Sequence, residues 1–194
     1  MREDPVVYEP PPSLDYPLQL TYMLIQDEIE RLCDNGRLLE VEPLDWRTEK
    51  KRNLYVSRDI HRFLAHKSDD ARTNKDRRML QALFDRFISG NFISVGLEPP
   101  VVYTDIKRLS PAYAEVWEFK VGKKQYHLRV FGRFAALNTF VTLTGPVDRM
   151  GLDYSNEILR CQEEWRNLLD GQPPVHGRYE SDYISPNGVS LRDS

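Results

Sequence analysis

Four charged or titratable side chains fall on one face of the segment Glu115–Thr144. Glu118 and Lys120 alternate with apolar residues in the first part of this segment, and His127 and Arg129 do so in the second. Lysine and arginine bind anionic groups, and histidine accepts or donates a proton near neutral pH. We therefore expect a sheet with a basic face that is available for function.

The element that positions these side chains is a predicted meander of three antiparallel strands. A two-residue hairpin loop at Lys123-Lys124 would pair Phe119 with Leu128 and Lys120 with His127. The large apolar residues then share the opposite face; they are Trp117, Phe119, Val121, Tyr126, Leu128 and Val130. Glu118 would lie opposite Arg129, so a cross-strand ion pair explains these two residues without any function.

The charge balance excludes a protein that is basic throughout. The 194 residues carry a formal net charge of -3, which argues against a general binder of polyanions. Within residues 101–133, however, basic residues outnumber Asp105, Glu115 and Glu118; they are Lys107, Arg108, Lys120, Lys123, Lys124, Arg129 and Arg133. Any contact with nucleic acid is therefore expected from this local patch.

Composition divides the chain into four parts. Residues 1–16 contain four prolines and predict an extended or disordered arm. Residues 17–53 predict an N-terminal helical extension, whose helix ends at a left-handed cap at Asn35-Gly36. Residues 54–170 contain the main domain, and residues 171–194, rich in Pro, Gly and Ser, predict a flexible C-terminal tail.

Two helices are expected before the meander of the main domain, and one after it. Ser57 is the predicted N-cap of a short helix, and Gly90 ends the longer helix that follows. The last helix is marked by apolar residues at helical spacing, which are Ile158, Cys161, Trp165 and Leu168.

The sequence also indicates the cellular location of the protein and whether it uses a metal or a cofactor. Cys33 and Cys161 are far apart and resemble the free thiols of a cytosolic protein. The first residues lack the apolar core of a signal peptide, and no apolar run reaches transmembrane length, so a cytoplasmic protein without membrane contact is expected. Nucleotide-binding, zinc-protease and serine-hydrolase motifs are absent, and His61 and His66 have no further ligand at metal-binding spacing. No metal site and no cofactor are predicted.

One family pattern agrees with this order of elements. The residues that carry it are Lys107-Arg108-Leu109, then Val116–Lys120, Tyr126–Phe131 and Thr139-Phe140-Val141. In these positions the chain resembles the RelE/ParE superfamily of toxin–antitoxin proteins, particularly the phage-derived HigB-like branch. The resemblance covers residues 54–169. It implies an α+β fold, namely a RelE-like antiparallel sheet with helices packed on one face, to which this chain adds an N-terminal helix.

The resemblance also implies an activity. Active toxins of this family are endoribonucleases that cut mRNA, usually on the ribosome, and a small antitoxin protein inhibits them. The ribose 2′-hydroxyl attacks the adjacent phosphate without a metal or an organic cofactor. Carried over by position, the catalytic residues are Lys120, His127, Arg129, Arg149 and Tyr154. The expected RNA contacts are Lys107, Arg108, Lys123, Lys124 and Arg133.

Two other functions remain open from the sequence. A non-catalytic RelE-fold protein of a phage or mobile element would hold a protein partner, and a ParE-type toxin would act on gyrase. The HigB-like branch often has a lysine pair after the third strand, where this chain has Thr142–Pro146, and this difference favours the binding protein. Simpler roles are also open, such as a solvated side chain for His127 and a cap or core-edge residue for Tyr154.

Overall fold

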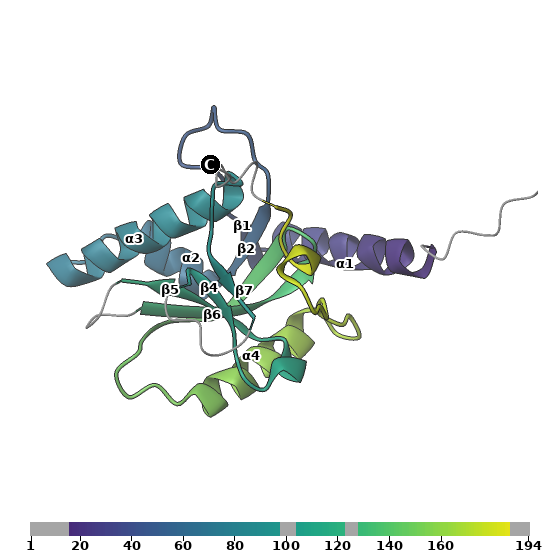
Figure 1. The fold of residues 1–194 in the computed structure, drawn as a ribbon. Coiled ribbons are helices and arrows are strands. Elements are labelled where there is room, and N and C mark those ends of the chain that lie inside the picture. Colours follow the sequence, from purple (N-terminus) through teal and green to yellow (C-terminus); the bar gives the residue numbers. More distant parts are fainter. Residues whose placement is uncertain (1–15, 98–103, 123–127, 187–194) are drawn as a thin grey trace, which may run out of the picture.

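A mixed β-sheet with helices on both of its faces forms the body of the protein (Figure 1). The computed structural model describes residues 16–97, 104–122 and 128–186, with side chains from residue 23 onward. In chain order the elements are α1 (Tyr16–Asp34), β1 (Leu38–Glu40), β2 (Asn53–Ser57), α2 (Arg58–Ala65), α3 (Ala71–Ile88), β3 (Val95–Gly96), β4 (Ile106–Arg108), η1 (Ala112–Ala114), β5 (Trp117–Val121), β6 (Leu128–Ala136), β7 (Thr139–Asp148), α4 (Tyr154–Leu168) and η2 (Glu180–Asp182).

The sheet confirms the predicted α+β class but is not purely antiparallel. Across the described residues it has seven strands in the order β1-β2-β7-β6-β5-β4-β3. The meander β5-β6-β7 is antiparallel as expected, whereas β2 pairs with β7 and β3 pairs with β4 in parallel. Parallel neighbours need a long crossover between them, and the chain from α2 to β6 supplies it for β2 and β7.

Helices cover both faces of the sheet, so the prediction of helices on one face was wrong. One core contains side chains of α2 and α3 together with Val130 and Phe134 of β6. The other contains side chains of α1 and α4 together with Phe131 and Ala135 of the same strand. Both sets of alternating positions along β6 are therefore buried, because each meets its own helical layer.

The N-terminal extension is part of the second core. Ile25, Ile29 and Leu32 of α1 are buried there beside side chains of α4. The predicted cap at the end of α1 is confirmed: Gly36 has φ 68°, and its N–H donates to the carbonyl of Cys33 at 2.9 Å. This cap turns the chain directly into β1, which pairs with β2.

The C-terminal segment differs from the flexible tail expected from residue 171. Val175 donates its N–H to the carbonyl of Phe134 at 2.8 Å, and Asn138 donates to the carbonyl of Tyr183 at 2.9 Å. The Tyr183 side chain is fully buried against Trp117 and Phe134. Residues 172–186 thus form a strap over one end of the sheet, held by an aromatic anchor that composition alone does not reveal.

The pairing of β5 with β6 is shifted by two residues from the predicted register. Phe119 lies opposite Val130, and Lys120 lies opposite Arg129. The connection is therefore longer than the two-residue loop expected at Lys123-Lys124, although the two faces keep their residues because the shift is even. Lys123, Lys124 and His127 lie outside the described residues.

Candidate functional site

Three neighbouring strands place their charged residues on the sheet face that α4 covers. Lys107 of β4 lies opposite Glu118 of β5, and Lys120 lies opposite Arg129 of β6. Residues directly opposite each other in a sheet point to the same face. The alternation in the sequence therefore grouped Glu118, Lys120 and Arg129 correctly, and Lys107 joins them through β4.

Glu118 and Arg129 form a buried ion pair. Nε of Arg129 lies 3.0 Å from Oε2 of Glu118, and only 4% and 5% of their side chains are exposed. Arg129 also donates from Nη1 to the carbonyl of Leu128 at 3.0 Å. The predicted ion pair is present, but it is diagonal, because Glu118 lies opposite Phe131. The expectation that these residues face solvent was wrong, because α4 covers them.

Tyr154 brings a hydroxyl group to this pair from the first turn of α4. The helix begins at the N-cap Asp153, whose carboxylate accepts from the N–H groups of Ser155 and Asn156. The ring of Tyr154 packs edge-on against Phe131, with 6.3 Å between the centroids, and its hydroxyl donates to Oε2 of Glu118 at 3.3 Å. Burial and the carboxylate of Glu118 raise the pKa of Tyr154, so this hydroxyl keeps its proton.

Lys120 is the half-buried cation of the group. Burial lowers the pKa of Lys120; Glu118 opposes this effect, while the positive charges of Lys107, Arg129 and Arg149 add to it. A lysine with a lowered pKa is more often in the neutral form, which can accept a proton, than an ordinary surface lysine. Lys120 thus combines a position beside three cations with a capacity to take up a proton.

Arg149 completes the group from the turn between β7 and α4. Its side chain is exposed, and its charge acts on both Lys120 and Tyr154. The structure therefore brings together four of the five predicted catalytic residues, Lys120, Arg129, Arg149 and Tyr154. The fifth, His127, lies outside the described residues. We define Lys107, Glu118, Lys120, Arg129, Arg149 and Tyr154 as the Lys120 site.

Two predicted RNA contacts have structural roles instead. Arg108 is buried and forms an ion pair with Glu115 at 3.2 Å, and it also donates to the carbonyl of Gly177 at 2.9 Å. Arg133 is buried with its guanidinium over the ring of Trp165, and it donates to the carbonyls of Ala114 and Glu115. Neither side chain is available on the surface, so both assignments were wrong.

Glu118 is the residue of the Lys120 site that we did not predict as functional. The sequence placed it on the correct face but gave it only an ion-pair role. The available signal was its alternation with Lys120, which puts a carboxylate among the cations of the same face. Its contact with Tyr154 joins residues 36 positions apart in the chain, and no local pattern predicts it.

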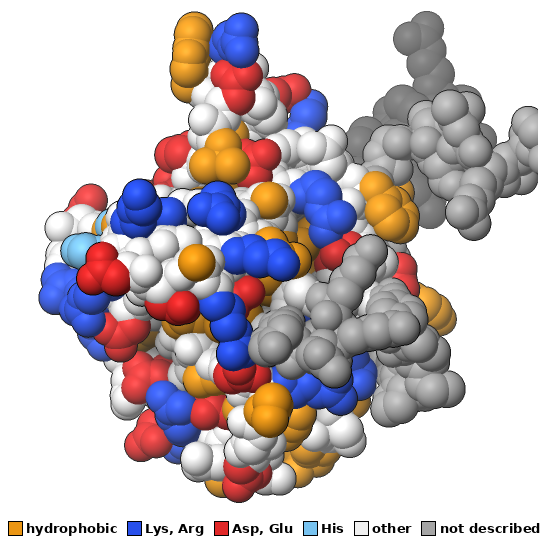
Figure 2. Space-filling model, turned by 90° about the vertical axis from the view of Figure 1, so that its left-hand side faces the viewer, with side chains coloured by type: hydrophobic (Ala, Val, Ile, Leu, Met, Phe, Trp, Pro, Cys, Tyr) orange, Lys and Arg blue, Asp and Glu red, His pale blue; other side chains and the backbone are white. Residues whose placement is uncertain are grey.

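Charges of both signs are mixed on one face of the molecule. Figure 2 shows numerous Lys and Arg side chains on the face turned towards the reader, with Asp and Glu between them. Beside Arg149 in the chain, Asp148 forms an ion pair with Arg72 of α3 at 2.7 Å. In the described part of the chain, no group of three His, Cys, Asp or Glu side chains is arranged to hold a metal ion.

Comparison of the chain with protein-family models, with curated proteins and with solved structures finds no match in any of the three. Among the described helices, none has both the length and the apolar character that crossing a membrane requires.

Proposed function

We propose that this protein is a HigB/RelE-like toxin that cleaves mRNA without a metal ion and is inhibited by a small antitoxin protein. The observation that carries the proposal is the convergence of Lys120, Arg149 and Tyr154, with Lys107 nearby, around the buried Glu118–Arg129 pair. The order of two helices, a meander and a closing helix supports it as well.

The proposed chemistry uses three side chains that reach the substrate. The neutral amine of Lys120 takes the proton of the ribose 2′-hydroxyl, whose oxygen then forms a bond to the adjacent phosphorus. The bond from phosphorus to the 5′-oxygen breaks, and Tyr154 donates its proton to this leaving oxygen. Arg149 stabilises the additional charge on the phosphate. The products are a 2′,3′-cyclic phosphate and a 5′-hydroxyl end.

The Glu118–Arg129 pair has a positioning role in this proposal. Glu118 accepts the hydrogen bond of Tyr154 and so orients its hydroxyl group, and Arg129 balances the buried charge of Glu118. Lys107 supplies a further positive charge for the RNA backbone.

The test combines growth and cleavage. Induced expression of the wild-type chain is expected to stop growth, and the purified protein to cut RNA in the presence of EDTA and leave 2′,3′-cyclic phosphate ends. Lys120→Gln and Tyr154→Phe are expected to lose cleavage by about 100-fold or more. The matched control is Lys51→Gln. The backbone N–H of Lys51 donates to the carbonyl of Ile88, which lies about 24 Å along α3 from Arg72 by helix geometry. Lys51 is therefore far from the Lys120 site, because Arg72 pairs with Asp148 beside Arg149.

A non-catalytic binding protein is the second candidate. The observation that favours it is the near-complete burial of Glu118 and Arg129, which form an ion pair with each other without a ligand. A wild-type chain that neither stops growth nor cuts RNA would reject the toxin and leave this candidate. Growth arrest without RNA cleavage would instead favour a ParE-type toxin that acts on gyrase.

A further inference from the structure

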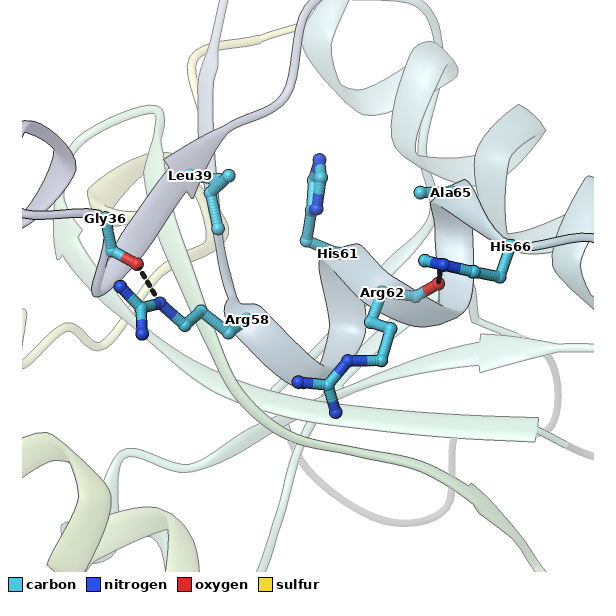
Figure 3. Close-up of a pocket in the computed structure, with 7 residues that line it drawn as sticks. All are labelled: Gly36, Leu39, Arg58, His61, Arg62, Ala65 and His66. Atoms are coloured by element: carbon cyan, nitrogen blue, oxygen red, sulfur yellow. Dashed lines mark hydrogen bonds between the residues drawn. The ribbon is translucent and has the colours of Figure 1, made fainter.

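A groove on the exposed side of α2 plays no part in the Lys120 site. It is an open depression of about 410 Å³ whose exposed surface is mainly apolar, and it is lined by Gly36, Leu39, Arg58, His61, Arg62, Ala65 and His66. Figure 3 shows Leu39 on β1 across from His61 and Ala65 on α2. This volume falls within the range of pockets that accept a ligand or a large side chain.

The rim of the α2 groove is positively charged. Residues 58–67 contain Arg58, Arg62 and Lys67 as exposed cations, against Asp59 alone as an acidic residue. Arg58 is fixed at the rim, since it donates to the carbonyls of Gly36 and Asn35, and Arg62 pairs with Asp59 at 3.1 Å. An apolar floor with a cationic rim fits an apolar side chain that is carried on an acidic segment.

The loop between β1 and β2 is a segment of this kind. It forms the projection at the top of Figure 1, and it exposes 88% of Trp46 and 67% of Leu44. Residues 40–49 contain Glu40, Glu42, Asp45 and Glu49 but Arg47 as their only cation. Lys50 and Lys51 at the base of the loop contact three of these carboxylates and neutralise part of the charge.

Hydrogen bonds support the loop, although the Trp46 side chain at its tip is 88% exposed. Leu44 donates its N–H to Oδ1 of Asp85 on α3 at 2.8 Å. Arg47 donates to both carboxylate oxygens of Asp45, at 3.0 and 2.8 Å, and the N–H of Thr48 donates to the Asp45 carbonyl at 2.8 Å. A preorganised loop with an exposed indole loses little conformational entropy on binding, which is typical of an interface anchor.

We propose that Trp46 of one copy of this chain inserts into the α2 groove of a second copy. The apolar tip matches the apolar part of the groove. Residues 40–51, with four carboxylates against three cations, are complementary in net charge to residues 58–67, with three cations against one carboxylate. Reciprocal insertion closes a two-fold dimer, the most common symmetry of soluble oligomers. The contact is small, so we expect a dissociation constant on the order of micromolar. This proposal does not depend on the function proposed for the Lys120 site.

Sedimentation equilibrium tests the dimer directly. Between about 1 and 200 μM, the wild-type mass is expected to rise from 22.8 kDa towards twice that value. Trp46→Ala is expected to remain a monomer over the same range. Tyr113→Ala is the matched control, because it also removes an exposed aromatic ring, and it is expected to dimerise like the wild type.

Iodide quenching of fluorescence tests the groove. Trp117 and Trp165 are buried, so the quencher reports on Trp46. The Ala65→Arg protein has a blocked α2 groove but keeps Trp46, so it is the fluorescent partner. The Trp46→Ala protein lacks this indole but keeps the groove, and an excess of it is expected to protect Trp46 of the Ala65→Arg protein from iodide. An excess of the Trp46→Ala/Ala65→Arg double variant, which has neither feature, is expected to give no protection.

Three results would overturn the proposal. They are a wild-type chain that stays at 22.8 kDa at the highest concentration, a Trp46→Ala variant that dimerises as strongly as the wild type, and equal protection by the Trp46→Ala and double variants. If the wild-type chain stays monomeric, an acidic segment of a different protein becomes the expected occupant of the α2 groove.

Discussion

Because the Glu118–Arg129 pair is buried, the geometry of the Lys120 site depends on both of its members. A charge in the interior is unfavourable unless it is paired and hydrogen-bonded. Glu118 meets this condition through Arg129 and Tyr154, and Arg129 meets it through Glu118 and the Leu128 carbonyl. A change in either member therefore leaves a buried charge on the other, and it also affects the position of the Tyr154 hydroxyl.

Arg129→Met is expected to lower the free energy of unfolding by about 3–5 kcal/mol, because it leaves the carboxylate of Glu118 buried and unpaired. Urea denaturation followed by circular dichroism measures this loss. Arg166→Met, on the exposed side of α4, is the control and is expected to keep the wild-type midpoint. The double variant Glu118→Gln/Arg129→Met is expected to recover part of the loss. A loss below about 1 kcal/mol, the range of exposed ion pairs, would contradict the burial.

The lowered pKa of Lys120 predicts the pH dependence of RNA cleavage. The amine accepts a proton only in its neutral form, so kcat/KM is expected to rise with pH and to level off below 10.5, the ordinary lysine value. Lys120→Arg keeps the charge but does not titrate, and it is expected to remove this rise. Rates from about pH 6 to 9, corrected for cleavage without enzyme, measure the profile. The same rise in Lys120→Arg would exclude Lys120 as the base.

Alternation along two strands was sufficient to group Glu118, Lys120 and Arg129 on one face, because side-chain direction in a strand is a local property. Their burial was not predictable, since it depends on α4, which packs onto that face from a distant part of the chain. Arg108 and Arg133 were misassigned for the same reason. Their partners include Gly177 and Trp165, which no local pattern connects to them.

At the scale of elements, the helices were easier to predict than the sheet. The apolar residues of α4 recur at helical spacing and all four are buried, and glycine follows the ends of α1 and α3 with positive φ. The outer strands β1, β3 and β4 are only two or three residues long, and the parallel pairing of β2 with β7 joins segments far apart in the chain, such as Asn53 and Thr139. The sequence signal of such short strands is too weak to fix a sheet order.

The strap of residues 172–186 depends on Tyr183. Tyr183→Ala removes a fully buried ring and is expected to lower the free energy of unfolding by about 3–5 kcal/mol. Tyr183→Phe keeps the ring but removes the hydroxyl that donates to Oε2 of Glu115 at 2.7 Å, with an expected loss of about 1–3 kcal/mol.

Tyr179→Ala is the control for the strap, because it lies in the same segment but is exposed, and its urea midpoint is expected to stay at the wild-type value. Hydrogen exchange at the N–H of Asn138 and Val175 adds a local measurement, since both donate to backbone carbonyls when the strap is in place. Fast exchange at both positions in the wild type would show that the strap is not bound.

On the scale of the whole molecule, one sheet serves two cores, and the N-terminal extension closes the second of them. The sequence suggested a domain beginning at residue 54 with an added helix in front of it. In the structure, α1 places Ile25, Ile29 and Leu32 among side chains of β2, β6, β7 and α4. The extension was not recognised as part of the core, because its apolar stripe shows only that α1 is amphipathic and not what it packs against.

A chain that begins at Asn35 is therefore expected not to fold. Burial of a large aliphatic side chain contributes about 1.5–3 kcal/mol, so the three residues of α1 together supply about 5–9 kcal/mol. The whole stability of a domain is about 5–15 kcal/mol. Ile29→Ala gives a graded test, with an expected loss of about 2–5 kcal/mol, and Met23→Ala, on the exposed side of α1, is its control. Circular dichroism and urea denaturation measure all three changes. A shortened chain with the wild-type midpoint would show that residues 35–194 fold without α1, which would then be an appendage.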